Sequence, residues 1–138
     1  MQRKLKVDKN FLPCAVNDGD EIFRNGIFHF NISAMISQLN SGMLDATLTE
    51  LKVVDHPSSF SCIDEDHIDH VDINKPVILA EIAPERYNLI DGNHRVEKAK
   101  RTGIKTVPCY KLTVDLHLAF LTEKSAYDSY VEYWNSKL

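Results

Sequence analysis

Residues 86–112 constrain the fold of this chain more than any other segment. The elements expected there are, in order, a strand at about 86–90, a tight turn at Asp91-Gly92, a helix from about 93 to 102, a stop at Gly103 and a strand at 106–112. Strands that alternate with a helix require a sheet on which the helix packs its apolar side. The segment therefore predicts an α/β or α+β fold with a mixed sheet and helices packed on it.

Hydrophobic spacing and turn residues predict the other elements. Asn25-Gly26 favours a type I′ turn between strands at about 21–24 and 27–30. The remaining expectations are a helix at 32–39 with Ile32, Met35, Ile36 and Leu39 at helical spacing, Asn31 or Ser33 as its cap and Gly42 as its end; strands at 51–54 and 77–82; a loop-like segment at 56–76; and a C-terminal helix at about 125–135 with Tyr127, Tyr130, Tyr133 and Trp134 along one broad side.

The length of 138 residues fits a single domain, 1–138, with a core at about 21–112 and the C-terminal aromatic helix added to it. Hydrophobic residues make up 43% and charged residues 26%, which excludes wholesale disorder. No apolar run approaches the roughly 20 residues of a membrane span, so no membrane partner is expected. The three cysteines form no Cys-x-x-Cys pair, which favours a reducing, cytoplasmic compartment, and Cys109 is expected to be buried.

The chain has 16 basic and 20 acidic side chains and a net charge of −4. This balance disfavours nucleic acid as a partner, because non-specific binding needs a basic surface. The basic segment 94–105 nevertheless leaves contact with a nucleic-acid backbone open. The sequence leaves the oligomeric state open as well.

The start of the helix after Asp91-Gly92 is a candidate anion site. The first N–H groups of a helix lack internal partners, and the helix dipole favours negative charge there. The predicted phosphate- or nucleotide-binding residues are Gly92, Asn93, His94, Arg95 and Lys98, with Gly92 allowing a ligand to approach the backbone.

A purely structural interpretation of the same segment stays open. Asp91 or Asn93 would cap the helix, and Glu97 would pair with Arg101 four residues later. Val96, Ala99 and Gly103 would then form the buried side of the helix.

The pattern Tyr87-x-Leu89-Ile90-Asp91-Gly92-x-His94-Arg95, followed by a helix, Gly103 and Val107-Pro108, resembles the ParB/sulfiredoxin superfamily. The flanks are similar too, because a helix at 32–39 precedes the core and Lys75-Pro76-Val77-Ile78-Leu79 resembles the Pro-Ile-x-Val strand of that superfamily. The resemblance covers about residues 27–112. It implies a nucleotide whose phosphates meet the backbone around Gly92 and Asn93 and the side chains of His94 and Arg95.

Several positions depart from the known members. Asn93 stands where sulfiredoxins carry their catalytic Cys, which excludes sulfinic-acid repair. Asn31 replaces a Lys of sulfiredoxins, and Gly92-Asn93-His94-Arg95 replaces the Gly-Glu-Arg-Arg of ParB partition proteins. Only one short helix is expected after the last strand, where ParB has a helix-turn-helix domain. The Asp-Gly-x-x-Arg form is also similar to free-serine kinases, but only Asp20 and Glu21 stand near the expected place of their catalytic Glu.

The leading functional hypothesis is a nucleotide- or phosphate-binding protein that acts as a phosphotransferase or nucleotide hydrolase. Asp91, by holding Mg²⁺ or orienting an acceptor hydroxyl, and His94, by neutralising charge, are its candidate catalytic residues, and Mg²⁺ with a nucleotide is the candidate cofactor. The alternatives are a non-catalytic binding or regulatory module on the same fold, or a ParB-like nuclease.

The acidic segment 64–72 contains His67 and His70 among carboxylates, which suit a divalent metal. Their spacing matches no specific metal motif, so a solvated acidic loop is the expected state. We therefore predict that His67 and His70 are not metal ligands, and that the resting protein holds no metal of its own.

Overall fold

The computed structural model describes residues 4–55, 68 and 70–138. Contacts divide the chain into two compact units, and each unit is built from separate stretches of sequence. The first contains Met1–Ala46, Ala80–Asn88 and Leu112–Leu138, and the second contains Thr47–Leu79 and Leu89–Lys111. Within the described ranges, no helix has both the length and the apolar character that a membrane span requires.

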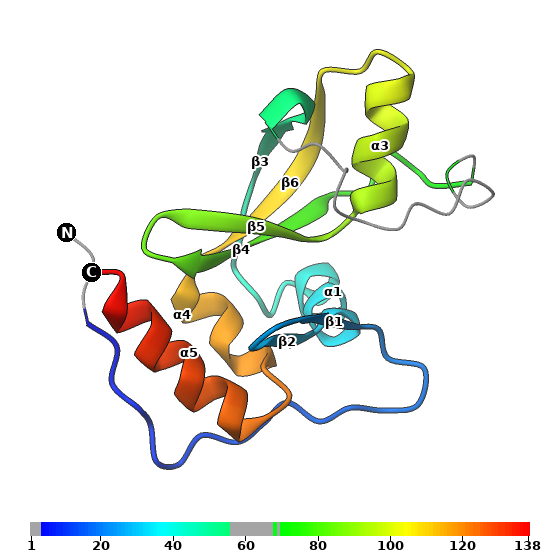
Figure 1. Cartoon of the computed structure of the whole chain (residues 1–138). Helices are drawn as coiled ribbons and strands as arrows, with labels where there is room; N and C mark the ends of the chain where they lie inside the picture. The colour runs from blue at the N-terminus through cyan, green and yellow to red at the C-terminus, as the bar shows by residue number, and fades with distance from the viewer. Residues whose placement is uncertain (1–3, 56–67, 69) are drawn as a thin grey trace. The chain divides into compact units, whose positions relative to one another are not determined.

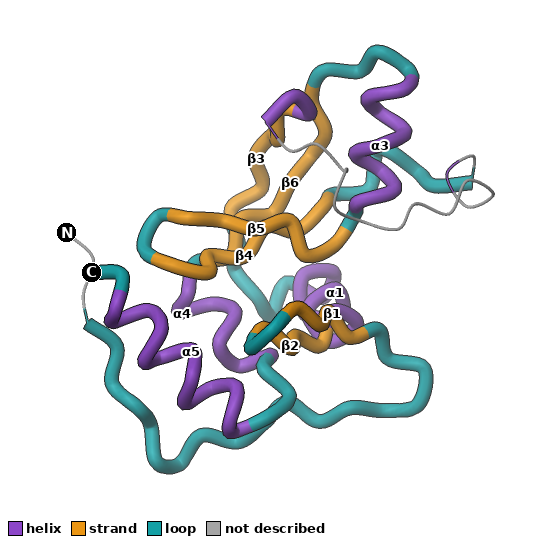
Figure 2. Tube along the Cα trace, viewed as in Figure 1, coloured by secondary structure: helices purple, strands orange, loops and turns teal. Residues whose placement is uncertain are grey.

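The first unit combines a β-hairpin with helices (Figures 1 and 2). Its elements are β1 (Ile22–Asn25), β2 (Phe28–Asn31), α1 (Ile32–Ser41), α4 (Val114–His117), the 3₁₀ turn η2 (Leu118–Phe120) and α5 (Lys124–Ser136). Strands β1 and β2 pair antiparallel, with Asn25 opposite Phe28. The predicted helix after this hairpin is confirmed, because the Asn31 side chain accepts from the Ala34 N–H at 3.0 Å and Gly42 ends α1 with φ 78°.

The hairpin turn lies one residue later than the Asn25-Gly26 turn that the sequence predicts. Gly26 and Ile27 form it, and of these two only Gly26 has a positive φ, 61°. That is the pattern of a type II′ turn rather than type I′. The register places Phe28 and Phe30 on one face, where the Phe28 ring lies 5.6 Å from that of Tyr130 and the Phe30 side chain is buried. A type II′ turn needs a positive φ only at its first residue, which Gly26 supplies, so Asn25 stays in β1 opposite Phe28.

The chain after residue 112 contains more helix than the sequence predicts. Helix α4 and turn η2 precede α5, so the expectation of a single short helix is wrong. Helix α5 extends the predicted 125–135 by one residue at each end, and three of its four aromatic residues are buried, Tyr127, Tyr130 and Trp134. The N-terminal segment lies along it, since the Asn135 amide makes two hydrogen bonds to the backbone of Leu5, at 2.8 and 2.9 Å.

The second unit holds β3 (Thr47–Lys52), the 3₁₀ turn η1 (Val53–Asp55), α3 (Asn93–Arg101) and most of β6 (Thr106–Leu112). The strand predicted at 51–54 instead begins at Thr47 and gives way to η1. Strand β3 pairs antiparallel with β6, with Leu51 opposite Val107. Pairing with residues 106–111 of β6 explains the earlier start, which the sequence hides because Leu48 is the only apolar residue of Thr47–Glu50.

Strands β4 (Val77–Ala83) and β5 (Arg86–Asp91) contribute to both units. They are joined by Pro84 and Glu85, and Glu85 has the only positive φ of a non-glycine residue in the described ranges, 62°. The four-stranded order is β3-β6-β4-β5, in a mixed sheet. The mixed α+β class predicted from the sequence is therefore confirmed. Most of the predicted loop 56–76 lies outside the described residues.

Candidate functional site

The turn between β5 and α3 is built around Gly92. Strand β5 ends at Asp91, and Gly92 is the N-cap residue of α3 with φ 108°, a conformation that residues with a side chain rarely adopt. A Cβ on Gly92 would lie 2.4 Å from Cγ1 of Val77. The glycine thus allows the turn to pack against the start of β4. The expectation that its missing side chain opens the backbone to a ligand is not what this geometry favours, because that side of Gly92 faces Val77.

Arg95 holds the turn together through three oxygen atoms. Its Nη2 donates to Oδ2 of Asp91 at 2.9 Å, and its Nη1 donates to the carbonyl oxygens of Pro76 at 2.5 Å and Lys75 at 3.3 Å. The side chains are 17% exposed for Arg95 and 10% for Asp91. We call Asp91, Arg95 and the carbonyls of Lys75 and Pro76 the arginine latch. It ties the end of β5 and the first turn of α3 to the segment before β4.

The predicted helix caps at Asp91 and Asn93 are wrong. Gly92 occupies the N-cap position and has no side chain to bond to the first turn of α3. The Asp91 carboxylate bonds to Arg95 instead. Among the described residues, no capping side chain covers the first backbone N–H groups of α3, which lie beside the half-buried Asn93 and His94. An anion placed there would meet these donors and the positive end of the helix dipole.

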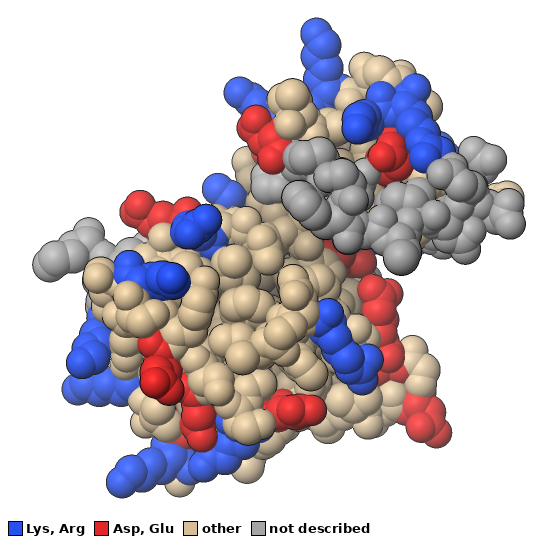
Figure 3. All heavy atoms as spheres, in the orientation of Figure 1, with Lys and Arg blue, Asp and Glu red and all other residues tan. Residues whose placement is uncertain are grey.

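The rest of α3 follows the structural interpretation closely. Glu97 and Arg101 form the predicted pair at 3.3 Å, and Val96 and Ala99 are fully buried, whereas Gly103 is exposed. Lys98 donates from Nζ to the carbonyl of Val71 at 2.9 Å. Figure 3 shows Lys and Arg side chains gathered around the part of the molecule that contains α3. The predicted binding residues are thus contiguous at one helix start, but Arg95 and Lys98 both have protein partners.

The described residues do not form a metal site by themselves. They contain no group of three or more His, Cys, Asp or Glu side chains arranged to hold a metal. His67 and most of the acidic segment 64–72 lie outside the described residues. Mg²⁺ in nucleotide sites is often held by one or two carboxylates together with substrate phosphates. Asp91 would be the carboxylate nearest the helix start, and Arg95 already contacts one of its oxygens.

A second polar cluster lies in the first unit, and the sequence analysis did not find it. Glu81 of β4 is 3% exposed, and its carboxylate accepts from the N–H groups of Glu85 at 2.9 Å and Val114 at 3.1 Å. The Glu81 carbonyl contacts His117 Nε2 at 2.6 Å and accepts from the Tyr130 hydroxyl. The Tyr130 hydroxyl also lies 3.2 Å from His117 Nε2. We call Glu81, His117 and Tyr130 the buried cluster.

Burial shifts the titration of this cluster. It lowers the pKa of His117 to about 4, because the charged imidazolium would lose its hydration, and the Glu81 carbonyl opposes the shift only in part. It also raises the pKa of the Tyr130 hydroxyl, with the charge of Glu81 adding to the rise. Nδ1 of His117 has no hydrogen-bond partner among the described residues. The cluster is fully enclosed, so we interpret it as a structural element. A Glu within the apolar run Val77–Ala83 was the available signal for it.

Cys109 behaves as its place in β6 predicts. It is fully buried, and burial raises the pKa of its thiol to about 11. A thiol held protonated in this way is a poor nucleophile.

Two sequence comparisons, with protein-family models and with curated proteins, find no match to this chain. None of the protein-family models matches it. The search of curated proteins finds no similar sequence. The resemblance to the ParB/sulfiredoxin superfamily therefore rests on the residues of the strand, turn and helix motif and its flanks.

Proposed function

We propose that this protein binds a phosphate-bearing small molecule, a nucleotide first of all, at the start of α3. The observation that carries the proposal is the uncapped helix start at Gly92, held by the close packing of Gly92 on Val77. In this arrangement the backbone N–H groups of the first turn and the side chains of Asn93 and His94 contact the phosphates. The resemblance to nucleotide-binding ParB/sulfiredoxin proteins supports the same position.

Arg95 has a different role in this proposal from the one that the sequence suggests. Its guanidinium contacts Asp91 and two backbone carbonyls, so it positions the turn rather than serving as the main phosphate ligand. Its positive charge still favours an anion nearby. Lys98 lies one helical turn further on, with its ammonium at the carbonyl of Val71, and contributes less.

The second candidate function is binding without catalysis. The arginine latch favours it over phosphoryl transfer, because it engages the Asp91 carboxylate. Phosphoryl transfer needs a group that holds Mg²⁺ or orients the acceptor. Asp91 is the nearest carboxylate of the motif, and its Oδ2 is bound by Arg95. Binding without turnover requires only the helix start. A phosphotransferase or hydrolase would require Asp91 to serve both Arg95 and the substrate.

A thermal-shift screen of ATP, GTP, AMP and inorganic phosphate, with and without Mg²⁺, tests the proposal. A ligand at 100 times its dissociation constant adds about 2.7 kcal/mol to the free energy of unfolding, which is readily measured. The best ligand is then titrated calorimetrically into the His94→Gln and Lys124→Gln variants. Lys124 is the control, because it is an exposed lysine of α5 in the first unit and has no part in the helix start.

We expect His94→Gln to weaken binding roughly tenfold, the loss of one hydrogen bond to a charged group. Lys124→Gln should change the affinity little. Equal losses in the two variants would indicate only a diffuse electrostatic attraction and would refute the site. A phosphate-release assay with the bound nucleotide separates the two candidate functions, since only the enzyme shows turnover.

A further inference from the structure

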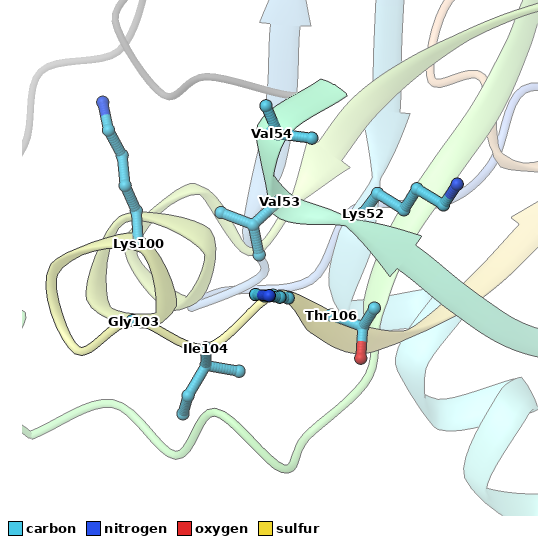
Figure 4. A pocket seen from close by; sticks show the side chains of 8 residues that line it. Lys52, Val53, Val54, Lys100, Gly103, Ile104 and Thr106 are labelled. Carbon is cyan, nitrogen blue, oxygen red and sulfur yellow. The ribbon is translucent and has the colours of Figure 1, made fainter.

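A pocket of about 720 Å³ lies in the second unit, at the C-terminal end of α3 rather than at its start. The residues that line it are Lys52, Val53, Val54, Lys100, Gly103, Ile104, Lys105 and Thr106. Its size falls within the range of small-molecule sites, which combine an apolar lining with a few polar groups. Figure 4 shows Val53 and Val54 at its centre, with the side chains of Lys52 and Lys100 extending to either side.

Backbone hydrogen bonds fix the walls of this pocket. The Val53 N–H donates to the carbonyl of Lys105 at 2.9 Å, which joins η1 to the start of β6. The Ile104 N–H donates to the carbonyl of Ala99 at 2.8 Å, and the Gly103 N–H donates to that of Lys100 at 3.3 Å. These bonds also give two carbonyl oxygens of the last turn of α3 hydrogen-bond partners.

The pocket combines exposed apolar side chains with positively charged ones. Val54 is 83% exposed and Ile104 36%, so both present apolar surface to a ligand. Among the described residues of the lining, the ionisable ones are Lys52, Lys100 and Lys105, and none of them carries a carboxylate. Charge complementarity therefore selects a negative ligand, and the valine and isoleucine side chains select one with an apolar body.

We propose that this pocket binds a small amphiphilic anion, an aromatic or aliphatic body that carries one carboxylate, sulfonate or phosphate group. The body contacts Val53, Val54 and Ile104, and the anionic group lies at the edge of the pocket, beside the ammonium group of Lys100 or Lys105. This site is separate from the helix start at Gly92, so it stands whether or not a nucleotide binds there.

A matched pair of fluorescent probes tests the proposal on the whole chain. Anilinonaphthalene sulfonate carries the negative group, and phenylnaphthylamine has the same aromatic body without it. We expect the sulfonate to bind at one site per chain, about tenfold tighter than the neutral probe, and to weaken as salt screens the lysines.

Two sets of variants locate the site. The double variant Lys100→Gln/Lys105→Gln should weaken sulfonate binding about tenfold and leave the neutral probe unchanged. The control Lys9→Gln/Lys124→Gln removes the same net charge from exposed positions outside the pocket and should change neither. Val54→Ser should weaken both probes about threefold, through lost apolar contact.

The proposal is wrong if the sulfonate does not bind, if the two double variants lose equal affinity, or if many probes bind without saturation, as they do to a loosened fold. The other possible occupant of the pocket is a second copy of the chain. Light scattering tests this by measuring the molar mass in solution. A dimer that Val54→Ser converts to monomer would assign the pocket to self-association and would also overturn the proposal.

Discussion

The arginine latch and the buried cluster are two polar groupings that meet the same physical demand in different ways. The latch joins a cation to a carboxylate and two carbonyls where solvent still reaches the side chains, at 17% and 10% exposure. The buried cluster encloses a carboxylate, an imidazole and a phenol at 3% exposure or less. The latch neutralises charge by pairing opposite signs, whereas in the cluster the Glu81 carboxylate meets backbone N–H groups and the imidazole stays neutral. Enclosure therefore raises the loss in the free energy of unfolding when any one hydrogen-bond partner is removed.

Glu81→Ala should have the largest effect on stability. It leaves the buried N–H group of Val114 and the part-buried N–H group of Glu85 without their acceptor, and it removes packed side-chain atoms. We expect the free energy of unfolding to fall by about 4 kcal/mol in urea denaturation. Glu132→Ala, at an exposed position of α5, is the control and should change it by less than about 0.5 kcal/mol. Similar losses for the two variants would show that the hydrogen bonds of Glu81 add no more stability than an exposed side chain does.

Gly92→Ala tests the latch region through its backbone. The new Cβ would lie 2.4 Å from Val77 Cγ1 at a φ of 108°, so strain and overpacking add. We expect a loss of about 3 kcal/mol in the free energy of unfolding. Gly42→Ala has a positive φ but open space around its Cβ, and it should cost only about 1 kcal/mol. Equal costs at the two glycines would mean that Val77 yields easily.

The free energy of unfolding should depend on pH through His117 of the buried cluster. The pKa of His117 is about 4 in the folded chain and about 6.5 in the unfolded chain. Above pH 6.5 the imidazole is neutral in both states, and as the pH falls toward 4 the unfolded chain binds the proton first. Stability is therefore lost across pH 6.5 to 4, by about 3 kcal/mol in total.

Subtracting the stability curve of His117→Gln from that of the wild type isolates this contribution. The difference should change between pH 6.5 and 4 and stay flat above pH 7. A flat difference throughout would show that His117 is protonated equally in both states.

Arg95→Ala should have the smallest of these effects on stability. It leaves the Asp91 carboxylate without its partner, but solvent reaches both side chains and reduces the cost. We expect a loss of about 2 kcal/mol in urea denaturation. The double variant Arg95→Ala/Asp91→Asn should recover part of it, because no carboxylate then remains unpaired. A single-variant loss as large as that of Glu81→Ala would erase the distinction between the regions.

Much of the local structure could be predicted from short-range patterns. Asn31 and Gly42 bound α1 as expected, Glu97 and Arg101 pair across one helical turn, and the order of strand, turn, helix and strand from residue 86 to 112 is confirmed. These features depend on residues within a few positions of one another. Predictions failed where distant partners decide, as for the hairpin turn at Gly26, the start of β3, and helix α4.

Short-range sequence signals place the candidate site at Asp91-Gly92 and the start of α3, because a glycine turn before a helix depends on neighbouring residues. The contacts that the side chains of this site make depend on the tertiary structure. Gly92 is required by Val77, and Arg95 contacts carbonyls 19 and 20 positions away. Glu81 meets Val114 and His117 across 33 and 36 positions, and the pocket joins η1 to the end of α3. Hydrophobic spacing carries no information about such pairs, because it records which face is buried and not which residue is on the other side.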